Sequence, residues 1–267
     1  MLVTFCLRLS LGLAASLLVL TPADVAPRFF RTQFLVILGL LAGAAFFVWP
    51  VASWSVILLI VLGMFLSFIA SIVWMLEGAP GGTILTIAAV LLLMGVSILQ
   101  LDSAWAVVDD WTSAALLGSA TSAMLMGHSY LVAPAMSIQP LLRLLVLLFA
   151  AVGLRGASAG LALSAVHFGG AEMLWLPVRW GVGLIGPLIL GAMAWQCARI
   201  RSTQSATGIL YVVVILCFIG ELTDMLYQGT SRPREAPALA WGSSHESAFR
   251  VSHLRPTGSA EAADARR

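Results

Sequence analysis

Residues 54–76 read WSVILLIVLGMFLSFIASIVWML, a run of apolar residues that contains no charged side chain. A helix needs about 20 such residues to cross the hydrocarbon core of a bilayer, which is roughly 30 Å thick. The run is followed at 77–82 by EGAPGG, a combination of glycine and proline that marks a turn. This stretch therefore predicts a transmembrane helix that ends at a short connection.

The same pattern recurs along most of the chain. Of all residues, 60% are hydrophobic and 10% are charged, and the mean hydropathy is +1.00. Soluble domains carry about 25% charged residues, so lipid is the solvent that fits this composition. We expect an all-α integral membrane protein, a multi-pass bundle of about eight transmembrane helices. The expected spans are 2–20, 34–49, 54–76, 83–101, 112–132, 141–166, 174–198 and 206–227.

Both ends of the chain need separate interpretation. The first segment carries Arg8 ahead of a short apolar stretch, which is also typical of a signal peptide. No A-x-A cleavage site follows, and the apolar run begins upstream at Leu2, so we expect a retained membrane helix. Residues 229–267 are rich in Gly, Pro, Ser, Ala and Arg without an apolar period, which predicts a disordered polar tail.

The arginines predict an orientation in the membrane. All fourteen basic residues are arginine, and those of the connections gather on the side opposite the termini if the number of spans is even. By the positive-inside rule that side is cytoplasmic, so we expect both termini to be non-cytoplasmic, in a bacterial cytoplasmic (inner) membrane. The residues concerned are Arg28, Arg31, Arg143, Arg199 and Arg201.

Several functional classes find no support in the sequence. A net charge of +2 gives no reason to expect a nucleic-acid partner. The three cysteines are scattered singly, which argues against a disulfide framework or a metal site. No glycine-rich phosphate loop, HExxH or GxSxG motif occurs, which weakens hydrolase and nucleotide-driven hypotheses. We therefore expect the lipid bilayer, and other membrane subunits, as partners and identify no catalytic residue.

His128 and Tyr130 form one candidate site, near the predicted cytoplasmic end of the span 112–132, with Arg143 close by in the next segment. His128 could ligate haem or, beside Tyr130, bond a quinone headgroup; the alternative is a hydrogen bond to a neighbouring helix. His167 is a second candidate, with an interfacial loop histidine as its alternative. At 1.5 Å per residue His128 lies about 20 Å from the membrane boundary of His167, which excludes one haem held by both.

Arg155 defines the second candidate site because a central arginine costs about 2.5–3.5 kcal/mol on insertion scales and needs a partner. Glu221 and Asp224 are three residues apart, share a helix face and lie near the same predicted end as Arg179. We expect an Arg179–Glu221 ion pair. Three roles stay open: a structural clamp, a proton or cation path through Glu221, and an anionic ligand held by Arg155.

Two further patterns have mainly structural interpretations. Asp109 and Asp110 are adjacent, so their side chains project in different directions, and we expect a solvated helix start before Trp111. A row of small residues at helical spacing predicts a close helix–helix contact. Its members are Ala114, Gly118, Ser122 and Ser129.

Three functions remain compatible with the sequence. The first is a non-catalytic membrane subunit of a redox or electron-transfer assembly, with a haem or quinone contact at His128. The second is a small transporter or permease that uses the buried charges of Arg155, Arg179, Glu221 and Asp224. The third is a membrane assembly or scaffolding factor, which requires none of these polar groups.

Overall fold

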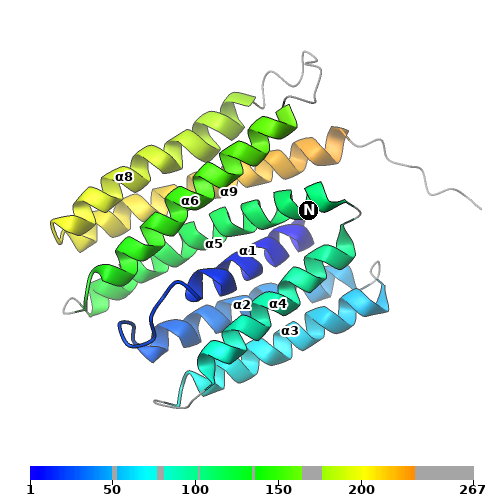
Figure 1. The fold of residues 1–267 in the computed structure, drawn as a ribbon, viewed down its shortest axis with the longest axis horizontal. Coiled ribbons are helices and arrows are strands. Elements are labelled where there is room, and N and C mark those ends of the chain that lie inside the picture. The colour runs from blue at the N-terminus through cyan, green and yellow to red at the C-terminus, as the bar shows by residue number, and fades with distance from the viewer. Residues whose placement is uncertain (50–52, 77–80, 102, 134–135, 164–175, 232–267) are drawn as a thin grey trace, which may run out of the picture. The chain divides into compact units, whose positions relative to one another are not determined.

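The computed structural model describes residues 1–49, 53–76, 81–101, 103–133, 136–163 and 176–231. These residues form eight α-helices and one π-helix, and no strand occurs among them (Figure 1). Helices α1 to α9 fall almost entirely within one compact unit, Met1–Gly229. His167 and the predicted tail beyond Ser231 lie outside the described residues.

The helices follow the apolar segments of the sequence with shifted ends. Helix α2 begins at Pro27, seven residues before the predicted start, because proline is well suited to the first turn of a helix. Helix α5 begins at Ala104, where the Ser103 side chain accepts a hydrogen bond from the Ala106 backbone N–H, so Asp109 and Asp110 lie inside it. The bounds are α1 Leu2–Leu17, α2 Pro27–Val48, α3 Trp54–Val73, α4 Gly82–Gln100, α5 Ala104–Val132, α6 Gln139–Leu163, η1 Val178–Ile185, α8 Gly186–Arg199 and α9 Thr203–Ser231.

The chain is a multi-pass helical membrane protein, but the predicted count of about eight spans is not supported. Within the described ranges, six helical stretches are long and apolar enough to cross a bilayer: 27–48, 54–73, 82–100, 139–161, 178–199 and 203–228. Helix α1 has 16 residues, a length of about 24 Å. Helix α5 is long but carries two aspartates and a row of serine, threonine and glycine, which lower its hydropathy.

Helices α1 and α5 are nevertheless the most enclosed of the unit. Helix α1 packs against α2, α4 and α5, and in Figure 1 the blue α1 runs beside the green α5. Ten of the 16 residues of α1 are buried, among them Arg8. Because neighbouring helices cover most of α1 and the polar face of α5, polar side chains there can be satisfied by protein partners.

The contact between α1 and α5 depends on glycine. A Cβ atom on Gly12 would lie 1.8 Å from the Ala114 carbonyl oxygen, and one on Gly118 would lie 1.9 Å from the Gly12 carbonyl carbon. One turn further along, Ser16 and Ser122 share a hydrogen bond of 2.5 Å. Three members of the small-residue row predicted from the sequence, Ala114, Gly118 and Ser122, thus lie on the face of α5 that packs on α1.

The outward faces of the other helices are apolar. Large hydrophobic side chains such as Phe46, Trp54, Leu58 and Phe65 are exposed on α2 and α3. Apolar exposure on this scale suits a lipid environment and would be unfavourable in water.

Candidate functional site

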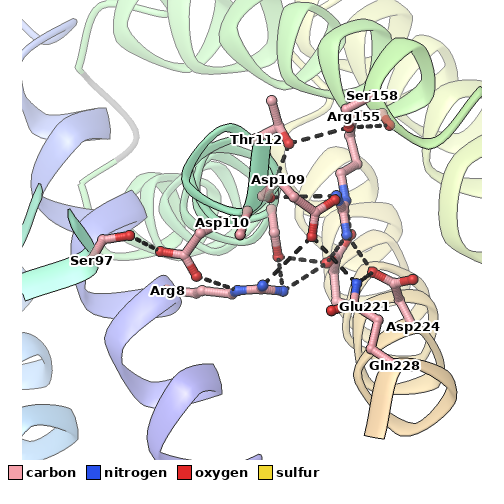
Figure 2. Close-up of polar contacts among 12 residues, drawn as sticks. Arg8, Ser97, Asp109, Asp110, Thr112, Arg155, Ser158, Glu221, Asp224 and Gln228 are labelled. Carbon is pink, nitrogen blue, oxygen red and sulfur yellow. Dashed lines mark hydrogen bonds and ion pairs between the residues drawn. The ribbon is translucent and has the colours of Figure 1, made fainter. Parts of the chain in front are cut away.

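Seven ionisable side chains form one buried charge network at the end of the unit where α1 and α5 begin and α9 ends (Figure 2). Six of them come from α1, α5, α6 and α9, and the seventh from η1. We name the set the buried charge network; its members are Arg8, Asp109, Asp110, Arg155, Arg179, Glu221 and Asp224.

Arg155 is the centre of this network. Its Nε donates to Glu221 Oε1 at 2.7 Å, and its Nη2 donates to Glu221 Oε2 at 3.0 Å and to Asp224 Oδ2 at 2.6 Å. Its Nη1 contacts the Asp109 carboxylate. The side chains of Arg155 and Asp224 are each 1% exposed. The expectation that Arg155 requires a partner is therefore met by three carboxylates from two helices.

Arg8 joins the first helix to the same network. Its Nε donates to Asp110 Oδ1 at 2.6 Å, and its Nη1 donates to the Ser113 hydroxyl at 3.2 Å. Asp109 and Glu221 lie farther from this guanidinium, at 3.7 and 3.9 Å. The Ser113 hydroxyl donates in turn to Glu221 Oε2 at 2.5 Å, which links the Arg8 half to the Arg155 half.

Arg179 lies on the π-helix η1 and is the third arginine of the network. Its guanidinium forms an ion pair with Asp224 Oδ1, so the expected Arg179–Glu221 pair is wrong: Glu221 pairs with Arg155, and Asp224 pairs with both Arg155 and Arg179. The side chain of Arg179 is 20% exposed, more than any other member of the network. Gly183 of the same π-helix packs directly on Gly220 of α9, where a Cβ atom on Gly183 would lie 2.7 Å from the Gly220 Cα.

The network lies well inside the helices. Arg8 and Asp110 are each six residues from the starts of their helices, about 9 Å at the rise of an α-helix. Arg155 is eight residues before the end of α6, about 12 Å. Charged groups at such positions are costly unless they are paired and hydrogen-bonded.

The charges of the network do not balance. Three guanidinium groups face four carboxyl groups, which gives a formal sum of −1 when all are ionised. Asp109, Glu221 and Asp224 each lie within 4 Å of two arginines, whereas the ion pairs of the described residues give Asp110 one, Arg8. The second oxygen of Asp110 meets the Ser97 hydroxyl of α4. Asp110 is therefore the carboxyl group with the least positive charge around it.

Comparison with protein-family models, with curated proteins and with solved structures finds no match for this chain. Within the described ranges, no three histidine, cysteine or acidic side chains gather as a metal site.

Asp109 and Asp110 were expected at a solvated helix start, and that expectation is wrong. Their side chains are 13% and 10% exposed and pair with Arg155 and Arg8. The error comes from the start of α5, which lies eight residues earlier than predicted and draws both aspartates into the bundle. The signal in the sequence is a single arginine, Arg8, in an otherwise apolar segment, which needs an acidic partner somewhere in the chain.

The candidates His128, Tyr130 and Arg143 lie at the opposite end of the unit and do not form one site. Tyr130 is buried, and its hydroxyl donates to the Ser137 backbone carbonyl. Arg143 pairs with Asp24 at 3.3 Å and bonds the Thr21 hydroxyl at 2.5 Å. His128 is exposed and lines a pocket of about 500 Å³ between the start of α2 and the end of α5. Tyr130 and Arg143 are not among its lining residues.

Proposed function

We propose that this protein is a proton-coupled membrane transporter in which the buried charge network is the coupling site. The observation that carries the proposal is the excess of one carboxyl group over the arginines in a network that joins five helical elements. Three carboxylates would be enough to balance the charge of the three arginines.

The excess charge favours proton binding. An uncompensated charge in a buried site costs several kcal/mol, and a carboxyl group removes that cost by taking up a proton. Asp110 is the group that we assign to this role, because Arg8 is the one guanidinium beside it among the described residues and the Ser97 hydroxyl can bond either form of the acid. Asp109 and Asp110 are also the most exposed carboxylates of the network, which gives protons a route to it.

Protonation of Asp110 would alter the balance of forces on Arg8. The guanidinium is 2.6 Å from Asp110 and within 4 Å of Asp109 and Glu221. When Asp110 becomes neutral, the attraction of Arg8 to Asp109 and to Glu221 dominates. A proton on α5 would thereby change the pairing between α1 and α9, which is the kind of differential interaction that a two-state transporter requires.

Proteoliposomes that contain a pH indicator test the proposal. An inward proton gradient is imposed with potassium and valinomycin present, and proton influx is followed alone and with panels of amino acids, sugars and organic cations. We expect protein-dependent influx that one class of solute accelerates and that Asp110→Asn abolishes. Asp24→Asn is the matched control because Asp24 pairs with Arg143 at the other end of the unit. Influx at the rate of protein-free liposomes under every condition would overturn the proposal.

The redox-subunit hypothesis has one supporting observation, the pocket at His128. Of the three residues first considered for a haem or quinone contact there, Tyr130 and Arg143 are already bonded to other partners. A visible spectrum of the purified protein, recorded with and without His128→Ala, tests it directly. A haem band that disappears in the variant would favour this hypothesis over transport.

A further inference from the structure

The pocket at the arginine-rich end of the unit is separate from the buried charge network, and its lining contains no member of that network. It lies between the first turns of α2 and the last turn of α5, and its volume is about 500 Å³, within the usual range for ligand sites. Most of its lining is apolar, as with Phe29, Leu125 and Val132. Its polar side chains come from Arg28, Thr32, Gln33, His128 and Ser129.

The two hydroxyl groups of the pocket are already bonded within their own helices. Thr32 donates to the Arg28 carbonyl at 2.9 Å, and Ser129 donates to the Leu125 carbonyl at 3.0 Å. Arg28 and His128 make no side-chain hydrogen bond or ion pair with the residues that the structure describes. The remaining groups of the lining are thus nitrogen donors on two exposed side chains.

Gln33 adds a buried polar group to the inner wall. Its side chain is fully buried and its Nε2 donates to the Ser122 hydroxyl at 3.4 Å, while its Oε1 has no hydrogen-bond partner in the described part of the chain. Buried polar atoms are normally hydrogen-bonded, and a primary amide can turn either its donor or its acceptor toward a ligand. The Gln33 amide is thus a buried polar group beside the pocket that its protein neighbours satisfy only in part.

The charge of the pocket selects the kind of ligand. Arg28 carries a full positive charge, the lining contains no acidic residue, and the start of α2 adds the positive end of a helix dipole without a side-chain cap. A neutral carbonyl would accept hydrogen bonds here but would leave the charge of Arg28 uncompensated. An anionic oxygen acceptor on an apolar body satisfies the donors, the charge and the apolar wall together.

We propose that this pocket binds an anionic phospholipid, with the phosphate at Arg28 and His128 and part of one acyl chain against Phe29, Leu125 and Val132. The position fits a lipid, because the pocket lies at helix ends, where headgroups are found. The surrounding end of the unit is basic, with Arg31 one turn along α2.

The test uses the full-length protein, stripped of lipid in detergent, and follows its thermal unfolding. Dihexanoyl phosphatidylglycerol is added and compared with dihexanoyl phosphatidylcholine, inorganic phosphate and a short-chain quinone. We expect stabilisation by phosphatidylglycerol above that by phosphatidylcholine. Arg28→Gln should weaken the apparent affinity for phosphatidylglycerol about fivefold, the effect of one arginine near an anionic lipid.

Two further variants separate the pocket from the general charge of this surface. Arg199→Gln removes an exposed arginine that does not line the pocket and should leave the lipid preference unchanged. Ala133→Trp should fill the pocket and abolish the preference while the protein remains folded. If Arg28→Gln and Arg199→Gln lose affinity for phosphatidylglycerol equally, the proposal is overturned. The absence of a preference between the two lipids would overturn it as well. If phosphate alone stabilises the protein, the ligand is a free anion and not a lipid. If the quinone alone stabilises it, the pocket supports the redox hypothesis instead.

Discussion

The Arg155 guanidinium donates two hydrogen bonds to the Glu221 carboxylate, from Nε to Oε1 at 2.7 Å and from Nη2 to Oε2 at 3.0 Å. The two residues lie on α6 and α9, and both are almost completely buried. Such paired contacts combine charge with fixed geometry, which only the planar guanidinium supplies. The pair holds two long helices together at a depth where neither charge could be accommodated alone.

Loss of this guanidinium is expected to be severe. Arg155→Gln leaves Glu221 and Asp224 short of their main partner, and breaking a buried pair in this way costs about 3–5 kcal/mol. Thermal unfolding in detergent, with Arg199→Gln as the exposed control, measures the effect. Arg155→Lys should also be destabilised because one ammonium cannot replace the paired contact. A midpoint for Arg155→Gln equal to that of the control would contradict this account.

Loss of the Asp110 carboxylate should have only a small effect on stability. Asp110→Asn leaves three arginines opposite three carboxylates and is expected to change stability by less than about 1 kcal/mol, within the range of mild substitutions. Glu221→Gln removes a carboxylate that faces two arginines and should cost clearly more. Equal destabilisation by the two variants would indicate a structural clamp in which every carboxylate is needed.

Infrared spectroscopy can identify the proton itself. If Asp110 binds the coupling proton, a carbonyl band of a protonated carboxyl group in the wild-type protein should be absent in Asp110→Asn. Asp24→Asn, which changes a carboxylate outside the network, should keep the band. A band that survives in Asp110→Asn would assign the proton to another member of the network.

The helix contact at Gly12 and Gly118 makes a prediction about packing. Gly12→Ala places a methyl group in the backbone of α5, and overpacking of this kind costs about 1–3 kcal/mol or more. Gly39→Ala is the matched control, because a Cβ atom there meets nothing within 4 Å and alanine favours the helix. If both variants unfold at the same temperature, the close approach of α1 and α5 is not a stabilising contact.

The orientation of the chain can be tested by labelling from each side of the membrane. In a background without the three native cysteines, Arg199→Cys and Ser103→Cys place single thiols at opposite ends of the unit. The positive-inside rule predicts that Cys at 199 reacts from the cytoplasmic side and Cys at 103 from the other. The reverse pattern would mean that both termini are cytoplasmic.

Local patterns in the sequence were sufficient to predict the helices and the need of Arg155 for a partner. Hydropathy identified the lipid-facing helices because their exposed faces must be apolar, as in residues 54–76. The count of about eight spans that the same criterion gave is not supported, because α1 is short and α5 carries polar groups that lower its hydropathy.

The composition of the buried charge network could not be predicted in the same way. Arg8 and Asp110 are separated by 102 positions along the chain, and the pairing depends on how α1 packs against α5. That packing depends on Gly12 and Gly118. The small-residue row of α5 predicted a close helix contact, but it did not indicate that α1 would be the partner. The choice between Glu221 and Asp224 as the partner of Arg179 was likewise decided by the π-helix, which sequence periodicity does not show.

The distance between Arg8 and Asp110 along the chain also has a consequence for biogenesis. At a synthesis rate of about 5–20 residues per second, α1 leaves the ribosome roughly 5–20 s before its acidic partner is made. Glu221 follows only after a comparable further delay. During that interval the nascent first helix carries an unpaired guanidinium that bare hydrocarbon would reject. We therefore expect the first helix to stay at the insertion machinery or at the lipid surface until α5 is made.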